Sequence, residues 1–136
     1  EAVVKAFVKT VACREAITQV MRTMKDDRSA EAAGLELAKA YLRWIIAKNE
    51  GSQALIAFAE SQGVSEKSSQ EEKKAFEARL GLDPALEART KAAEDEWLKE
   101  FSRIARNPAW KAIHEEAQDA AFQAMQAKRP APKSGG

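Results

Sequence analysis

The chain of 136 residues has few of the side chains that would indicate a particular chemistry. It contains one cysteine, Cys13, and one histidine, His114. A single cysteine cannot form an internal disulfide or a CxxC redox motif, and the sequence lacks the cysteine and histidine clusters of a zinc site. The 22 basic and 21 acidic side chains nearly cancel. This balance excludes the strongly basic footprint of a protein that binds phosphate backbones, so we predict no nucleic-acid partner.

Long apolar runs and glycine-rich loops are also missing. The longest apolar runs, such as residues 55–59, are far shorter than the roughly 18 residues of a membrane-spanning helix, so no membrane span is expected. No GxSxG elbow and no phosphate-binding loop occurs, because the internal glycines are isolated. The chain begins at Glu1 rather than methionine, which suggests a trimmed form or a mature form whose leader has been removed.

What the chain does contain is typical of one soluble helical domain. Hydrophobic residues make up 45% and charged residues 32% of the sequence, and a chain of this length buries about two thirds of the surface that it exposes when unfolded. About a fifth of the residues are alanine, and glycine and proline fall between periodic segments rather than inside them. The composition therefore predicts an all-α fold without a sheet.

Apolar periodicity predicts two long helices in the first half of the chain. The first covers about residues 2–25, with one apolar stripe in each half (Val4, Val8 and Val11; Ile17, Val20, Met21 and Met24). Asp27 or Ser29 is expected to cap a second helix that runs to about Lys48, where residues 49–51 (Asn-Glu-Gly) form a stop signal.

The second helix is predicted to be the most buried, because apolar residues cover nearly its whole circumference. Only a narrow polar strip interrupts two apolar arcs (Ala33, Leu37, Ala40, Tyr41, Trp44 and Ile45; Leu35, Leu42 and Ile46). We therefore expect the helix at the centre of the domain, with Leu42 and Trp44 as core residues.

Local signals divide the second half of the chain. Ser52 is expected to start a short helix through Gln62, and a serine-rich loop follows over residues 63–69. Ser69 and Glu72 have capping-box spacing ahead of another short helix, which Gly81 would end. The pairs Asp83-Pro84 and Asn107-Pro108 predict the starts of two long helices, of which the second reaches about Ala127.

Together these segments predict a four-helix bundle of two antiparallel helical hairpins, with two short helices inserted between them. The connections within each hairpin are only a few residues long, which requires the joined helices to be antiparallel. Residues 1–127 would form the single bundle domain. Residues 128–136, rich in proline, glycine and positive charge, would form a disordered basic tail.

His114 invites a catalytic interpretation, because it is the only side chain whose ordinary pKa lies near neutral pH. No carboxylate that could orient its imidazole lies three or four residues away on the helix, where the neighbours are Trp110, Lys111, Ala117 and Gln118. The favoured interpretation is a half-buried histidine at the edge of the apolar stripe, beside Trp110 and Met125. We predict no catalytic residue and no enzyme.

The sequence also argues against a metal or cofactor. A di-metal bundle needs Glu-x-x-His pairs, and Lys111 stands three residues before His114. The carboxylate pairs Glu96/Glu100 and Glu115/Asp119 are expected to face solvent, away from the apolar stripes. Haem ligation by His114 with a methionine (Met21, Met24 or Met125) lacks a CxxCH attachment motif. We predict neither a metal site nor a cofactor.

Cys13 and the tryptophans are interpreted structurally. Cys13 shares a side with Ile17, Val20 and Met24, which predicts an inert buried thiol; a nucleophilic role would require His114 as its base. Three tryptophans on three inward faces, Trp44, Trp97 and Trp110, favour core volume over a ligand site.

The segment of residues 20–33, with Leu37 after it, resembles part of small secreted helical proteins of planctomycete and verrucomicrobial bacteria. In those proteins a helix, a Lys-Asp turn and a Ser-Ala-x-Ala-Ala helix start recur. The resemblance covers about a tenth of the chain and implies an exported protein of unknown function, periplasmic or secreted rather than cytoplasmic. It transfers no site residue.

The sequence thus favours a non-enzymatic helical interaction or structural module. Its partner would be another protein or a second copy, with the arc of Leu35, Leu42 and Ile46 available for self-association. The alternative is a ligand- or cofactor-binding sensor bundle with a pocket near His114 and Trp110, whose small-molecule ligand the sequence does not name.

Overall fold

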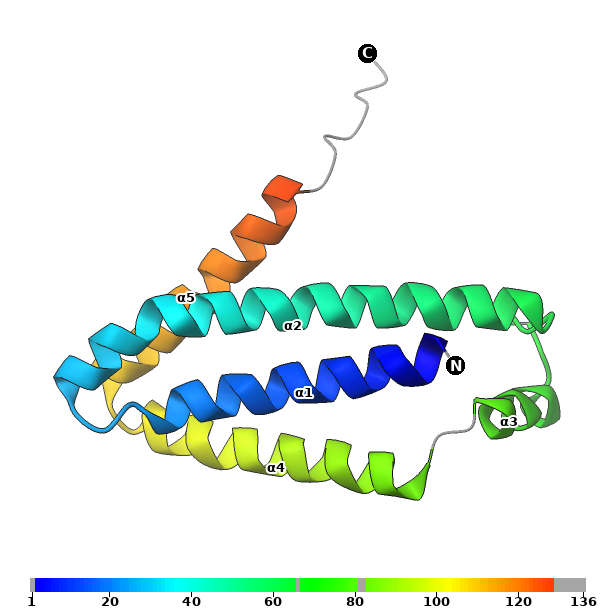
Figure 1. Ribbon diagram of the computed structural model, residues 1–136, viewed down its shortest axis with the longest axis horizontal. Helices are drawn as coiled ribbons and strands as arrows, with labels where there is room; N and C mark the ends of the chain where they lie inside the picture. Colours follow the sequence, from blue (N-terminus) through cyan, green and yellow to red (C-terminus); the bar gives the residue numbers. More distant parts are fainter. Residues whose placement is uncertain (1, 66, 81–82, 129–136) are drawn as a thin grey trace, which may run out of the picture.

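The computed structural model describes residues 2–65, 67–80 and 83–128, which form five helices (Figure 1). In chain order they are α1 (Ala2–Arg22), α2 (Asp27–Ser61), α3 (Gln70–Arg79), α4 (Pro84–Ala105) and α5 (Pro108–Lys128). The described residues contain no strand, which confirms the all-α prediction. The expected stop at Gly81 and the predicted tail, except for Lys128 at the end of α5, lie outside the described residues.

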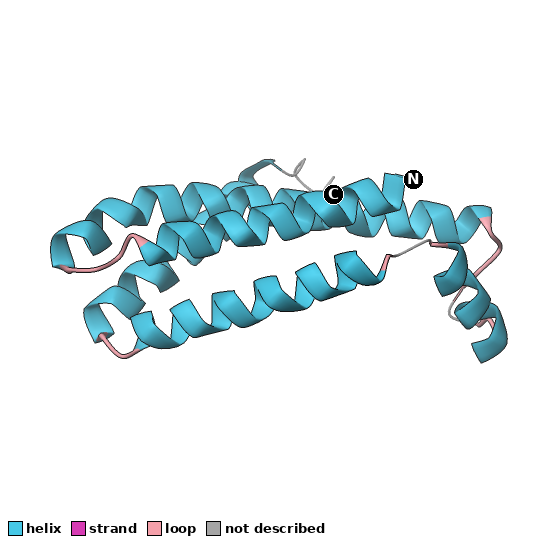
Figure 2. Cartoon of the chain, turned by 60° about the horizontal axis from the view of Figure 1, so that its bottom comes forward, coloured by secondary structure: helices cyan, strands magenta, loops and turns pink. Residues whose placement is uncertain are grey.

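Helix α1 lies between α2 and α4 and packs closely against both (Figures 1 and 2). It runs antiparallel to α2 and in the same direction as α4. Two ion pairs join α1 to α4, Glu15 with Arg89 and, about two turns further along both helices, Arg22 with Glu96, each at 2.5 Å. Helix α5 packs on α2, crosses it, and projects beyond it with its C-terminal half (Figure 1). The backbones of α2 and α4 make no comparable close contact in the described part of the chain.

Side-chain caps set the starts of the helices. Asp26 caps α2, because its carboxylate accepts from the Ser29 backbone N–H at 2.7 Å while the Ser29 hydroxyl accepts from the Asp26 backbone N–H at 2.9 Å. The prediction that Asp27 or Ser29 caps the helix is therefore wrong, because the cap is Asp26. Ser29 is the third residue of the helix, and its side chain completes the capping box by binding back to Asp26. The predicted caps at Ser69, Asp83 and Asn107 are confirmed.

The predicted stop at residues 49–51 is wrong, because α2 continues through it to Ser61. The short helix expected over residues 52–62 is the last part of α2. Helix α2 ends at Ser61, and a turn at Gly63 follows it. The positive φ of Gly63, 70°, allows the Val64 N–H to donate to the Ala59 carbonyl at 2.9 Å. This left-handed glycine turn satisfies carbonyls that the helix end would otherwise leave unpaired.

Gly51 lies inside α2 because the packing against α1 requires a small residue there. A side chain added at Gly51 would meet Ala6, Phe7 and Thr10 of α1 at 3.7–3.8 Å. Buried alanines at positions 33, 40 and 47 lie on the same face of α2. Small residues on this face bring the two helix axes close together, and the resulting contact outweighs the low helix propensity of glycine.

The core lies at the end of the molecule where α1, α2, α4 and α5 meet. Its fully buried large side chains are Ile17, Met21, Met24, Leu37, Ile104 and His114. The prediction that Leu42 and Trp44 are central is wrong, because both are only half-buried, and Leu35 of the same apolar surface is 66% exposed. In α1 the stripe begins at buried Val3 rather than Val4, and Val8 is exposed.

Replacing Gly51 with alanine tests whether α2 is continuous. The added methyl group would make ordinary van der Waals contacts, and alanine gains about 0.5–1 kcal/mol over glycine inside a helix. We expect Gly51→Ala to raise the free energy of unfolding by about that amount in urea titrations. A loss of stability would indicate that the helix ends at this position after all.

Truncation of Leu37 tests the position of the core. Leu37 has no exposed surface, so Leu37→Ala should lower the free energy of unfolding by about 3 kcal/mol. Leu35→Ala on the same helix serves as the control and should change it by less than about 0.5 kcal/mol, because Leu35 is largely exposed. Equal losses from the two variants would contradict the assigned burial.

Candidate functional site

His114 lies at the centre of the core rather than at its edge. It is 0% exposed, and its Nε2 lies 2.5 Å from the Tyr41 hydroxyl oxygen. Trp97 Nε1 donates to the same hydroxyl oxygen at 3.0 Å, and the Phe101 ring packs on the imidazole with centroids 5.1 Å apart. The expectation of a half-buried histidine beside Trp110 and Met125 is therefore wrong. His114 instead joins α5 to side chains of α2 and α4.

The Tyr41 hydroxyl links two neighbouring side chains. Its oxygen accepts from the Trp97 indole N–H, and it shares a hydrogen bond with His114 Nε2, which leaves the other imidazole nitrogen, Nδ1, outside this contact. That buried Nδ1 has no hydrogen-bond partner among the described residues. Burial lowers the pKa of His114, against a weaker opposing effect of Glu115, and burial raises the pKa of Tyr41 to about 12. Both side chains are neutral at pH 7.

Cys13 does not pair with His114. Its thiol is half-buried on α1, and burial is the largest of the effects that raise its pKa. A thiol with a raised pKa is mostly protonated near neutral pH and is a poor nucleophile. Among the described residues, the imidazole of His114 makes its polar contact with Tyr41, so the structure does not bring together the cysteine and histidine that a nucleophilic mechanism would require.

The three tryptophans occupy different environments. Trp97 stacks on Phe101, with ring centroids 5.1 Å apart, and the Trp110 indole N–H donates to Asp27 at 2.8 Å. The guanidinium of Arg14 and the ammonium of Lys48 each lie 5.0 Å from the Trp44 ring. His114 and Trp110 line none of the five pockets identified in the described part of the chain.

Three of the four carboxylates considered as metal ligands, Glu96, Glu100 and Glu115, form ion pairs. Glu96 pairs with Arg22, and Glu100 pairs with Arg103 at 3.0 Å. The expectation that Glu100 faces solvent is wrong, because it is 9% exposed. Arg103 also donates to the Met21 and Met24 carbonyl oxygens at the end of α1, and this docking of α4 on α1 buries its partner Glu100. Within the described ranges, no three metal-ligating side chains converge.

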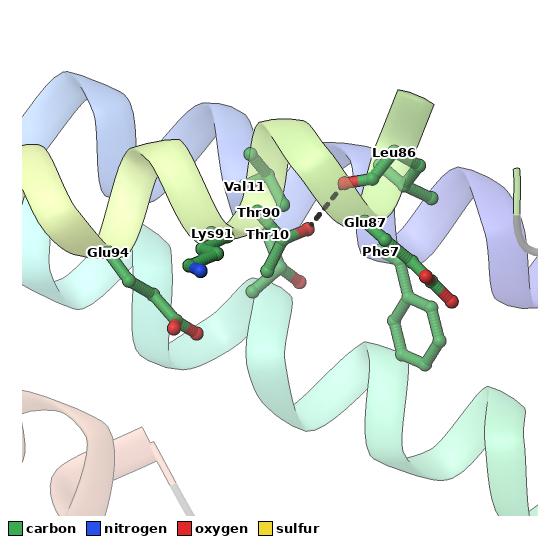
Figure 3. A pocket seen from close by; sticks show the side chains of 8 residues that line it. All are labelled: Phe7, Thr10, Val11, Leu86, Glu87, Thr90, Lys91 and Glu94. Atoms are coloured by element: carbon green, nitrogen blue, oxygen red, sulfur yellow. Dashed lines mark hydrogen bonds between the residues drawn. The ribbon is translucent and has the colours of Figure 1, made fainter. Parts of the chain in front are cut away.

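An apolar groove lies where α1 is left uncovered between α2 and α4. Its central pocket, with a volume of about 460 Å³, is shown in Figure 3. Phe7, Thr10 and Val11 of α1 form its floor, and Leu86 and Thr90 of α4 form one wall. Val11 is 6% exposed and Phe7 is half-buried, so much of the surface of both side chains is already packed within the protein.

The groove extends in both directions from this pocket. Toward the core it continues along Thr10, Val11 and Thr90 into a pocket of about 250 Å³ beside Trp44. Toward α3 it shares Phe7 and Glu87 with a wider pocket of about 850 Å³. The apolar lining there comes from the end of α2, from α3 and from the residues that follow each (Leu55, Ile56, Ala59, Val64, Phe76 and Leu80). We call the three connected pockets the open groove.

The two ends of the open groove carry opposite charge. Near α3 its rim has the carboxylates of Glu60, Glu77 and Glu87 and one ammonium, that of Lys73. At the other end the cations Arg14 and Lys48 flank Trp44, and the carboxylate of Glu94 also lines that pocket. The charged residues of the central pocket are Glu87, Lys91 and Glu94. A ligand in the groove therefore meets an apolar floor, an acidic end and a basic end.

Sequence periodicity did not identify this groove. Its residues come from four helices, and most of its apolar side chains are half-buried, so each resembles an ordinary edge of a helical stripe. In the structure Ile56 is 58% exposed although it lies in an apolar segment of the sequence. Its position beside Leu55 became informative only when α2 was seen to continue past Gly51.

Comparisons with protein-family models, with curated proteins and with solved structures find no match to this chain. None of the described helices is both long enough and apolar enough to cross a membrane. The function must therefore be inferred from the geometry of the chain itself.

The buried imidazole predicts a dependence of stability on pH. The pKa of His114 is about 6.5 in the unfolded chain and is lower in the folded chain. At pH values between these two pKa values the unfolded chain binds a proton that the folded chain does not. The contribution of the neutral imidazole to stability is therefore complete above pH 6.5 and is lost as the pH falls below it. We expect the free energy of unfolding to fall by up to about 1.4 kcal/mol per pH unit in that window.

Urea unfolding at pH 7.5 and pH 5.5 measures this effect. In His114→Gln, which has no group that titrates in this range, the difference between the two pH values should be much smaller than in the parent chain. An equal loss in both proteins would show that other groups cause the pH dependence.

Proposed function

We propose that this protein is a non-enzymatic helical interaction module that binds an amphipathic helix in the open groove. The observation that carries the proposal is the groove along α1: half-buried Phe7 and buried Val11 line a continuous apolar groove between α2 and α4, and α5 covers only the other end. Large apolar surfaces rimmed by charge are typical of protein-binding sites.

In this proposal α1, α2, α4 and α5 act as a four-helix bundle of two hairpins, and α3 is an insertion between the hairpins. Along part of its length the bundle lacks the fourth helix. His114 and Trp110 hold the first half of α5 against α2. The second half departs from the body (Figure 1), and the corner that a fourth helix would normally fill is left as the groove. A helix from another chain would complete the bundle there.

The dimensions and the lining support a helix as the ligand. Lys48 and Glu60, which flank the two ends, are separated by about 18 Å along the axis of α2, enough for about three helical turns. Helix-in-groove recognition uses an apolar floor with charged rims, which matches the lining described above. The wide opening to solvent favours such a ligand over an enclosed small molecule.

The distribution of ionisable groups supports a non-enzymatic role. The carboxylates of Glu15, Glu96 and Glu100 are paired with arginines, and the imidazole of His114 is neutral and sealed behind Trp97 and Phe101. The alternative, a ligand- or cofactor-binding sensor near His114 and Trp110, would require those rings to move before a ligand could reach the imidazole.

A designed helical peptide tests the proposal. The probe is a fluorescein-labelled amphipathic peptide of about 14 residues, with leucines on one face, two glutamates in its first turn and two lysines in its last. Fluorescence anisotropy should report a dissociation constant of about 10 μM, a value common for short helices in shallow grooves. Thr90→Arg, which places a long cation in the groove, should weaken binding at least tenfold.

Leu35→Ser is the matched control, because Leu35 is exposed on α2 and lines none of the three pockets of the groove. It should leave the affinity for the peptide unchanged. Absence of binding at 500 μM protein, or equal affinity of the parent chain and Thr90→Arg, would overturn the proposal.

A further inference from the structure

We propose that the helix received by the open groove is the C-terminal half of α5 from a second copy of this chain. The inference rests on the proposed function, because it names the occupant of the same groove. It is carried by three features of α5: an exposed aromatic side chain, a carboxylate that matches the cations at one end of the groove, and an anchor that keeps this segment out of its own groove.

The C-terminal half of α5 presents apolar surface that the described residues leave partly uncovered. Phe122 is 59% exposed, and Met125, one turn later, is only half-buried. Figure 1 shows this half of α5 projecting away from the other helices. Burial of this phenyl ring in an apolar groove would remove its hydrophobic surface from water, which favours association. The open groove offers the complementary surface, because its floor around Phe7 and Val11 is apolar and open.

One charge of this segment matches the charges along the groove. Asp119 precedes Phe122 by one turn on the same side of α5. With Phe122 over the central pocket, Asp119 would lie toward the cations of Arg14 and Lys48.

The anchoring of α5 argues that the occupant comes from another molecule. Ala117 and Ala121 are 4% and 1% exposed in the core, and Ile113 packs on Gly34 of α2. These contacts fix the direction in which the continuous helix leaves the body. Moving its own end into the groove would separate the buried alanines from the core. A second copy needs no such change.

Every copy carries both the groove and the projecting helix. Two copies can therefore exchange their α5 ends reciprocally, which gives a closed dimer with two equivalent contacts. This places self-association in a different part of the molecule from the arc of Leu35, Leu42 and Ile46 that the sequence suggested.

Sedimentation velocity of the full chain from 5 to 500 μM tests the inference. We expect the 14.9 kDa monomer to convert to a species of twice that mass as concentration rises. Phe122→Asp should weaken the association at least tenfold, because it places a carboxylate on the apolar floor. Leu35→Asp, the matched control at another exposed apolar position, should leave it unchanged.

A charge exchange tests the orientation. Lys48→Glu and Asp119→Lys should each weaken the association, and the double variant should recover at least half of the lost affinity, because the exchanged pair restores the attraction. Circular dichroism checks that each variant keeps its helical content. Recovery in the double variant would not follow from a merely structural effect of either substitution.

Two outcomes would overturn the inference: a parent chain that stays monomeric at 500 μM, or a dimer that Leu35→Asp disrupts and Phe122→Asp does not. The peptide experiment separates this failure from that of the proposed function. A monomeric chain that still binds the designed peptide retains the groove as a binding site and rejects the second copy as its occupant. A monomeric chain that also fails to bind the peptide rejects both.

Discussion

The close packing of α2 on α1 constrains the rest of the molecule. Ala33, Ala40, Ala47 and Gly51 lie on one face of α2, and a methyl group added at Gly51 would be in van der Waals contact with Ala6, Phe7 and Thr10. Small residues allow the two axes to approach along most of α1. Because α2 continues to Ser61, it forms a wall that extends past the core as far as α3. The remaining helices pack against this pair.

Helix α4 packs on α1 and helix α5 packs on α2, and the open groove results from this difference. Arg103 and two ion pairs hold α4 against α1, whereas His114, through Tyr41, holds α5 against α2. Only at the core do all four helices meet. Beyond it, α4 and α2 stand apart with α1 beneath them, so the same contacts that build the core leave an apolar floor exposed.

Particular residues show where sequence reasoning succeeded. Ser69, Asp83 and Asn107 were identified as caps because capping depends on one side chain and the backbone amides two or three residues away. Residues 49–51 were misinterpreted because an Asn-Glu-Gly run ends a helix only if no neighbour stabilises its continuation, and α1 does so here. His114 and Glu100 were misplaced because their burial depends on α2, α4 and α1 rather than on their own helices.

The sequence by itself determined that the chain is helical, where most helices begin, and that its few reactive side chains carry no local catalytic pattern. These properties arise from interactions between residues a few positions apart. Only the tertiary structure decided that α2 is continuous, that His114 lies at the centre of the core, and that an apolar groove with oppositely charged ends remains open. Those features depend on contacts between residues 40 or more positions apart, such as Lys9 with Glu50 and Tyr41 with His114, which no local pattern encodes.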